Sequence, residues 1–199
     1  MRPLIISISI MTTLSASALA GEPLPRGWGG GDKIKGYVLE TDPHEKLDGF
    51  PVLAIRSTPE TPADGHAAIG TSFLAERYRG KRVRFSAFVK SAGLERWGGL
   101  YLAVKRELQA SGAEGYLRYD NMMDRQIQGT TAWTRYDVVL DVPVEAEYFS
   151  LGFHLFQKGT LWMSRPTFET VGLDVPVTRA TGSIPVDLPK EPQLDLAKR

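Results

Sequence analysis

The chain has 199 residues, of which 42% are hydrophobic and 24% are charged, which is the composition of an ordinary globular domain. Lys and Arg number 24 against 23 Asp and Glu, a balance that argues against a nucleic-acid-binding protein. Because the sequence has no cysteine, disulfides, thiolate metal sites and cysteine nucleophiles are excluded. Stability must therefore come from the buried core of a single domain.

Residues 1–20 have the pattern of a secretory signal peptide. Arg2 supplies the positive start, residues 3–14 are apolar, and Ala18 and Ala20 frame a small-x-small cleavage site. The apolar stretch is shorter than the roughly 20 residues that a membrane-spanning helix requires, and no later segment is long and apolar enough to span. We therefore predict a periplasmic or secreted protein without a membrane span, beginning at Gly21.

The next residues, 21–34, are rich in Gly and Pro and predict an irregular lead-in. Short apolar segments separated by turn residues follow. The clearest is 81–90, where apolar side chains occupy every second position, the period of a half-buried strand. Similar segments predict further strands at 35–41, 51–57, 66–73, 98–107, 136–142, 148–156, 160–164 and 167–171. Helical signals are few and short, at 73–79 and 107–114.

Several short strands with a turn every 8–12 residues are typical of a β-sandwich or barrel. Alternation within the strands favours antiparallel sheets that each bury one face, and no strand–helix–strand rhythm indicates a parallel sheet. We therefore predict an all-β fold, an antiparallel β-sandwich over residues 35–172. Residues 173–199 contain four prolines and few strand formers, which predicts a proline-rich C-terminal tail.

Three stretches carry a resemblance to a known family: residues 78–90 with 97–100, residues 119–133, and their continuation 134–143. They resemble bacterial jelly-roll domains, mostly of unknown function, that also occur appended to helix-turn-helix regulators of the arabinose-operon type. These domains are distantly similar to galactose-binding-like folds and carbohydrate-binding modules. The resemblance extends from about Tyr37 to Gly172 and implies a jelly-roll, galactose-binding-like sandwich, but no particular reaction.

Many carbohydrate-binding jelly rolls end in a strand whose acidic pair helps to hold a structural calcium ion. Ser164 and Arg165 stand at that place here. Calcium prefers several oxygen ligands with carboxylate charge, so we predict no calcium there. His44, His66 and His154 lack the spacing of a metal-binding motif, and we predict neither a metal nor a cofactor. His154 alternates with apolar residues and is predicted to lie at the surface of its strand.

The polar segment 120–125 lies between two apolar stretches and supplies Asn121, Asp124 and Arg125 as candidate ligands for sugar hydroxyls. Asp and Asn side chains also stabilise turns by binding nearby backbone amides. The alternative interpretation is therefore a long turn held by its own side chains, with Arg125 paired to Asp124 or Asp120. Both interpretations remain open at this point.

Aromatic side chains are candidates for stacking on the apolar face of sugar rings. Trp97 is the best of the tryptophans because the two glycines that follow it let a partner approach closely. Tyr101 and Tyr119 complete the aromatic set. Trp133 is expected to cap the sandwich core, and Trp162 is either exposed or part of a sheet that is covered on both sides.

The sequence contains no nucleophile elbow, phosphate-binding loop or dinucleotide fingerprint, and we assign no catalytic residue. We predict an exported, non-catalytic binding module for a saccharide or similar polar ligand. The residues predicted to bind it are Trp97, Tyr101, Tyr119, Asn121, Asp124 and Arg125. Two alternatives stay open: a protein-interaction or structural module of the cell envelope, and a small glycan or ester hydrolase that uses Asp120 or Asp124.

Overall fold

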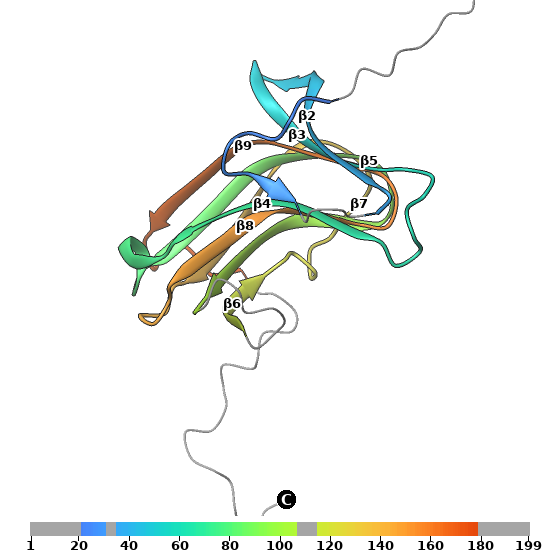
Figure 1. The fold of residues 1–199 in the computed structure, drawn as a ribbon. Helices are drawn as coiled ribbons and strands as arrows, with labels where there is room; N and C mark the ends of the chain where they lie inside the picture. Colours follow the sequence, from blue (N-terminus) through green and yellow to red (C-terminus); the bar gives the residue numbers. More distant parts are fainter. Residues whose placement is uncertain (1–20, 31–34, 107–114, 179–199) are drawn as a thin grey trace, which may run out of the picture.

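The computed structural model describes residues 21–30, 35–106 and 115–178, which form an antiparallel β-sandwich (Figure 1). The strands are β1 (Gly29–Gly30), β2 (Tyr37–Leu47), β3 (Phe50–Ser57), β4 (His66–Leu74), β5 (Arg82–Lys105), β6 (Tyr116–Asp120), β7 (Ile127–Asp141), β8 (Tyr148–Phe156) and β9 (Thr160–Val171). A 3-10 turn, η1 (Glu76–Tyr78), lies between β4 and β5. Nothing in the described part of the chain forms a helix with the length and hydropathy to cross a bilayer.

Strand β5 takes part in both layers of the sandwich. Its residues 82–92 pair with β7 on one side and β9 on the other, whereas residues 97–105 pair with β8 and β6. The first sheet therefore has the order β2-β3-β9-β5-β7, and the second sheet has the order β1-β4-β8-β5-β6. Pairing with β7 shifts three times between Val89 and Gly98, and such bulges bend a strand enough to carry it from one sheet to the other.

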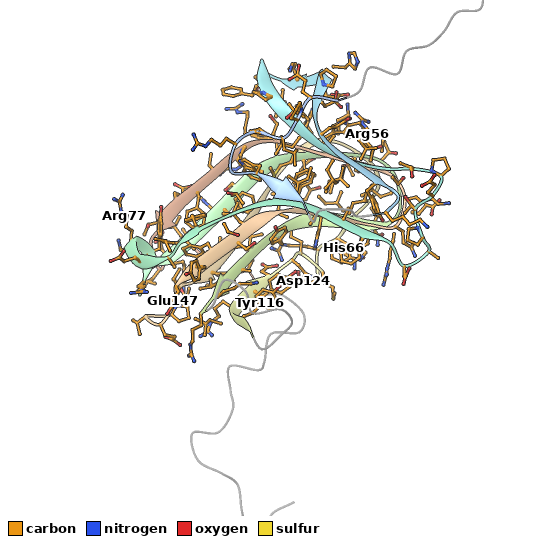
Figure 2. All side chains as sticks on the ribbon, viewed as in Figure 1. Arg56, His66, Arg77, Tyr116, Asp124 and Glu147 are labelled. Atoms are coloured by element: carbon orange, nitrogen blue, oxygen red, sulfur yellow. The ribbon has the colours of Figure 1, made fainter. Side chains whose placement is uncertain are left out.

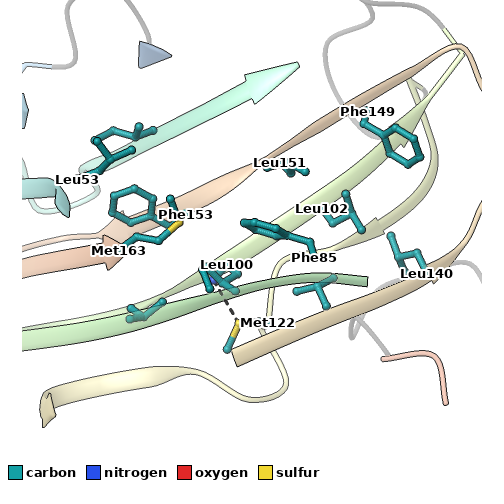
Figure 3. Close-up of a cluster of buried hydrophobic side chains, with 14 of the residues drawn as sticks. Leu53, Phe85, Leu100, Leu102, Met122, Leu140, Phe149, Leu151, Phe153 and Met163 are labelled. Atoms are coloured by element: carbon teal, nitrogen blue, oxygen red, sulfur yellow. Dashed lines mark hydrogen bonds between the residues drawn. The ribbon is translucent and has the colours of Figure 1, made fainter. Parts of the chain in front are cut away.

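The core lies between the two sheets. Figure 3 shows side chains from β5, β7, β8 and β9 meeting there, and their largest members are the fully buried Phe85, Phe149 and Phe153. Burying each such side chain contributes roughly 1.5–3 kcal/mol relative to leaving it in water. The predicted alternation in 81–90 is confirmed, because every second residue from Val83 to Val89 belongs to this core.

Strand lengths differ from the prediction in three places. The segments 81–90 and 98–107 belong to one strand, β7 begins at Ile127, and β9 runs through Pro166. Pro166 is tolerated because the pairing of β9 with β3 ends at Ser164, so the missing N–H faces no partner on that side. Strand β6 was not predicted, while the predicted helix at 107–114, the signal peptide and residues 179–199 lie outside the described residues.

Residues 172–178, which we call the strap, follow β9 and run along strand β7. The Arg82 guanidinium donates to the carbonyl oxygens of Leu173 at 2.9 Å and Val175 at 2.7 Å. At the end of the strap, the Thr178 N–H donates to the carbonyl oxygen of Val139 on β7 at 2.9 Å. The strap thus supplies partners to an edge strand whose backbone groups would otherwise face solvent.

Candidate ligand-binding face

The outer faces of the two sheets differ in chemistry; in Figure 2, Arg56 marks the first sheet and His66 marks the second. Ion pairs cover the first: Arg56 with Glu40 and Asp42, Lys90 with Glu45, Arg82 with Asp141, Arg84 with Glu169, Arg135 with Asp137, and Arg165 with Asp48. In strands β1, β4, β6 and β8 and residues 97–105 of β5, which make up the second sheet, the one carboxylate is Asp120, which is fully buried. The second sheet therefore presents rings, hydroxyls and small side chains instead of paired charges.

Trp162, on the first sheet, is held in a closed cluster. Its Nε1–H donates to Asp42 at 2.8 Å, and the cationic groups of Arg56 and Lys90 lie 5.1 and 5.0 Å from its ring. Burial alone would raise the pKa of Asp42, but its hydrogen bonds and the Arg56 charge outweigh burial and lower it. Trp162 is thus covered by charged side chains, and Trp133 packs beside it rather than capping the core, contrary to the prediction.

Arg165 lies at the place where a calcium ion was considered. Its guanidinium is 5.0 Å from the ring of Phe50 and 5.4 Å from that of Phe88, and it donates to Asp48 at 2.7 Å. A cation is therefore already supplied there by the chain itself. Elsewhere in the described part, no three His, Asp or Glu side chains gather as a metal site would need.

The second sheet carries what we call the aromatic face: the outward side chains of His66, Trp97, Tyr101, Tyr119, His154 and Phe156. His66 on β4 and Trp97 on β5 both lie directly opposite Phe156 on β8. The Phe156 ring stacks on His66 at 4.2 Å and on Trp97 at 4.4 Å between centroids. His66, Phe156 and Trp97 thus form a row of three stacked rings, which we call the ring ladder. Trp97 is only 3% exposed and supports Phe156 from one end of this row.

His154 lies within this group of rings, with centroid distances of 4.9 Å to Trp97, 5.0 Å to Phe156 and 5.8 Å to Tyr101. It is 2% exposed, so the predicted surface position is wrong; the surrounding rings cover it. Burial, with a smaller contribution from His66, lowers the pKa of His154 to about 3. The neutral ring bonds the Asn121 carbonyl through Nε2 at 3.1 Å, which places its proton on Nε2 and leaves Nδ1 as an acceptor.

Two tyrosines predicted as ligand contacts also lie on the aromatic face. The Tyr101 hydroxyl lies above Gly70, where a Cβ would come within 2.0 Å of it, and bonds Ser150. Tyr119 stacks on Tyr116 at 4.7 Å between centroids. Burial raises the pKa of Tyr101 and raises that of Tyr119 to about 12, so both hydroxyls keep their protons at neutral pH.

Small side chains separate the ring ladder from the Tyr116–Tyr119 stack. The register places Gly70 of β4 opposite Gly152 of β8, and Ser72 opposite Ser150. We call this set the floor, and it consists of Ala68, Gly70, Ser72, Ala103, Ser150 and Gly152. Gly70 leaves the room that the Tyr101 side chain occupies, so the ring of Tyr101 covers the floor at this level of the sheet.

The turn 120–125 borders the aromatic face and is held by its own side chains. The Asp120 carboxylate accepts the Met122 N–H at 2.8 Å and the Arg125 guanidinium at 2.7 and 3.1 Å. Arg125 also pairs with Asp124 at 2.8 Å. The contacts expected of a long turn held by its own side chains are therefore present. Whether Asn121, Asp124 and Arg125 also touch a ligand stays a prediction.

Sequence reasoning brought Trp97, Tyr101 and Tyr119 to one face but missed several of its members. His66 and Phe156 alternate with core residues on β4 and β8, which was a usable signal. Their meeting with Trp97 depends on the register between three strands that are distant in the sequence, and this register is not encoded in any one segment.

No protein-family model matches the chain. A curated relative, the uncharacterized HTH-type transcriptional regulator YbfP of Bacillus subtilis, is 37% identical over 174 residues, which cover 80% of this chain and 55% of the regulator. The chain therefore spans about half the length of this relative.

Two solved structures share the fold. The enzymatically active domain of bacteriophage CBA120 tailspike protein 4 has a TM-score of 0.53 at 11% identity, covering 73% of this chain and 20% of that one. The CBM22-1–GH10 modules of Clostridium thermocellum xylanase 10B, complexed with xylohexaose, have a TM-score of 0.51 at 14% identity, covering 77% and 28%. With the strand order above, these likenesses establish the chain as an antiparallel β-sandwich of the jelly-roll kind, as predicted.

Proposed function

We propose that this chain is an exported module that binds a saccharide on the aromatic face. The observation that supports this most is the contrast between the two outer faces. Rings, hydroxyls and a floor of small side chains lie on the second sheet, whereas paired charges occupy the first. Aromatic surfaces with nearby hydroxyl donors and acceptors suit a sugar, which has an apolar face and polar edges.

The floor suggests how the ligand lies. Gly70, Gly152 and Tyr101 are at one level on three adjacent strands, β4, β8 and β5. Adjacent strands are about 4.8 Å apart, so a ligand lying across them would cover roughly 10 Å of the sheet. The ring ladder would bound it on one side, and hydroxyls of Ser72 and Ser150 would meet it on the other. An extended oligosaccharide crossing the strands fits this arrangement.

We propose binding without turnover. Glycoside hydrolysis ordinarily needs two carboxyl groups flanking the scissile bond. In strands β1, β4, β6 and β8 and residues 97–105 of β5, the single carboxylate is Asp120, which is fully buried and bonded to Met122 and Arg125; Asp124, in the bordering turn, is paired with Arg125. The first twenty residues, with their signal-peptide pattern, support export.

Calorimetry and a glycan array test the proposal on the full mature chain. Xylohexaose is the first ligand to try, because the xylanase that shares the fold was crystallised with it. Ser72→Tyr would place a ring over the floor, and Thr170→Tyr is the matched control at an exposed position of β9 in the first sheet. We expect Ser72→Tyr to lose saccharide binding and Thr170→Tyr to keep it. An array without any bound saccharide, or equal binding by both variants, would contradict the proposal.

The likeness to a transcriptional regulator favours a second candidate, in which the same face serves as the ligand-sensing part of a regulator. Cell fractionation separates the two candidates. A protein that begins at Gly21 and is released with the periplasm supports export. A chain that retains residues 1–20 and stays in the cytoplasm supports the sensing role instead.

A further inference from the structure

Asp120 lies at the junction between the aromatic face and the strap. Its fully buried carboxylate accepts hydrogen bonds from Met122 and Arg125, as described, and also from the hydroxyl of Thr178. The Thr178 oxygen in turn accepts the Val139 N–H at 2.8 Å. The end of the strap is therefore fixed to β7 and to Asp120 by the same side chain.

One peptide unit connects Asp120 to the aromatic face. The Met122 N–H donates to Asp120, and the Asn121 C=O accepts a hydrogen bond from His154. Both groups belong to the same planar peptide unit and point in opposite directions. Rotation of that plane would break both hydrogen bonds together. Met122 has a φ of 63°, which is uncommon for a residue with a side chain. Its partners, rather than backbone preference, must hold the plane in place.

The far end of this chain of hydrogen bonds is the His154 ring. The hydrogen bond to the Asn121 carbonyl keeps the proton of His154 on Nε2 and fixes the orientation of the His154 ring. Because Trp97, Tyr101 and Phe156 all contact His154, a different ring orientation would change the packing of the aromatic face. A continuous series of hydrogen bonds thus connects Thr178 to the aromatic face through Asp120, the 121–122 peptide unit and His154.

We propose that Asp120 and Thr178 are positioning residues for ligand binding, and that docking of the strap onto Asp120 sets the His154 tautomer and the packing of the aromatic face. The effect on affinity rests on the proposed function, whereas the effect on His154 does not. By thermodynamic linkage, a saccharide on the face and a docked strap stabilise each other. Events that pull on the strap would therefore weaken ligand binding.

Nitrogen-15 NMR of the histidine side chains in the full mature chain tests, without a ligand, whether Thr178 controls the tautomer of His154. In the wild type we expect His154 to show a single Nε2–H tautomer whose proton exchanges slowly. Thr178→Val keeps the side-chain shape but removes the hydroxyl, and should give faster exchange and mixed tautomers. Thr178→Ser should restore the wild-type signal, and His44, on the first sheet, serves as an internal reference. An unchanged His154 signal in Thr178→Val would overturn the proposal.

Calorimetry with xylohexaose, or with whichever saccharide the array identifies, then tests the effect of Thr178 on saccharide affinity. Thr178→Val should bind about fivefold more weakly, the equivalent of one ordinary hydrogen bond. Thr178→Ser and the exposed control Thr170→Val should bind as the wild type does. Equal affinity of Thr178→Val and the wild type would contradict the coupling. If the wild type binds no saccharide, the proposed function fails and the His154 signal alone decides the positioning role.

Discussion

Replacing His154 with Gln should remove a specific loss of stability in acid. The pKa of His154 is about 3 in the folded protein, against about 6.5 for histidine in an unfolded chain. Below pH 6.5 the unfolded chain therefore binds a proton that the folded protein does not. The stability contributed by neutral His154 is complete above pH 6.5 and is lost progressively as the pH falls toward 3.

The size of the effect follows from one proton. Each pH unit in this window costs about 1.4 kcal/mol of unfolding free energy. Between pH 7.5 and 4.5, where only the part below 6.5 counts, His154 should account for a loss of about 2.5–3 kcal/mol. Burial also lowers the pKa of His66; its contribution has the same sign and persists in the variant.

Urea unfolding at pH 7.5, 6.0 and 4.5 measures this contribution. Gln keeps an N–H donor for the Asn121 carbonyl but does not titrate, and its lost ring contacts cost the same at every pH. The stability gap between wild type and His154→Gln should therefore narrow by about 2.5–3 kcal/mol across the range. Thr170→Val, a non-titrating change at an exposed position of β9, should parallel the wild type. An equal pH dependence of His154→Gln and the wild type would refute a buried neutral histidine.

Three further outcomes can be measured. Asp42→Asn should lower the unfolding free energy by about 1–3 kcal/mol in urea, because Trp162 and two backbone amides lose a charged acceptor; saccharide affinity should not change, since this cluster lies on the opposite sheet. Phe153→Ala should cost about 3–5 kcal/mol in the same assay through the cavity it leaves in the core. The proposed export predicts that Ala18→Arg blocks removal of the signal peptide, so that mass spectrometry finds residues 1–20 retained.

Period-two alternation located the core because it reports which side of a strand is buried. Phe85 and Phe153 could be assigned to the interior from their neighbours alone. The same rule misplaced His154, since it takes every position opposite the core as solvent-facing. Cross-strand neighbours and the turn cover this histidine, and neither can be recognised within its own segment.

In the candidate site, too, contacts within one segment could be predicted, whereas contacts between distant segments could not. Pairing of Arg125 with Asp124 or Asp120 was one of two interpretations of a single polar segment, and it needs only short-range information; the structure shows both pairs. The third partner of the Asp120 carboxylate, Thr178, comes from a stretch that was predicted to be a tail. Likewise, β5 was divided into two strands, because the bulges that carry it between sheets interrupt its alternation.

A saccharide titration followed by backbone NMR tests the location of binding most directly. On adding the saccharide, the largest shift changes should fall on Ser72, Tyr101, Ser150 and Gly152, with smaller ones at Asn121. Amides around Ala54, Lys90 and Trp162 on the first sheet should stay unchanged. Changes centred on those first-sheet residues, or none at saturating concentrations of any saccharide on the array, would contradict a sugar-binding aromatic face.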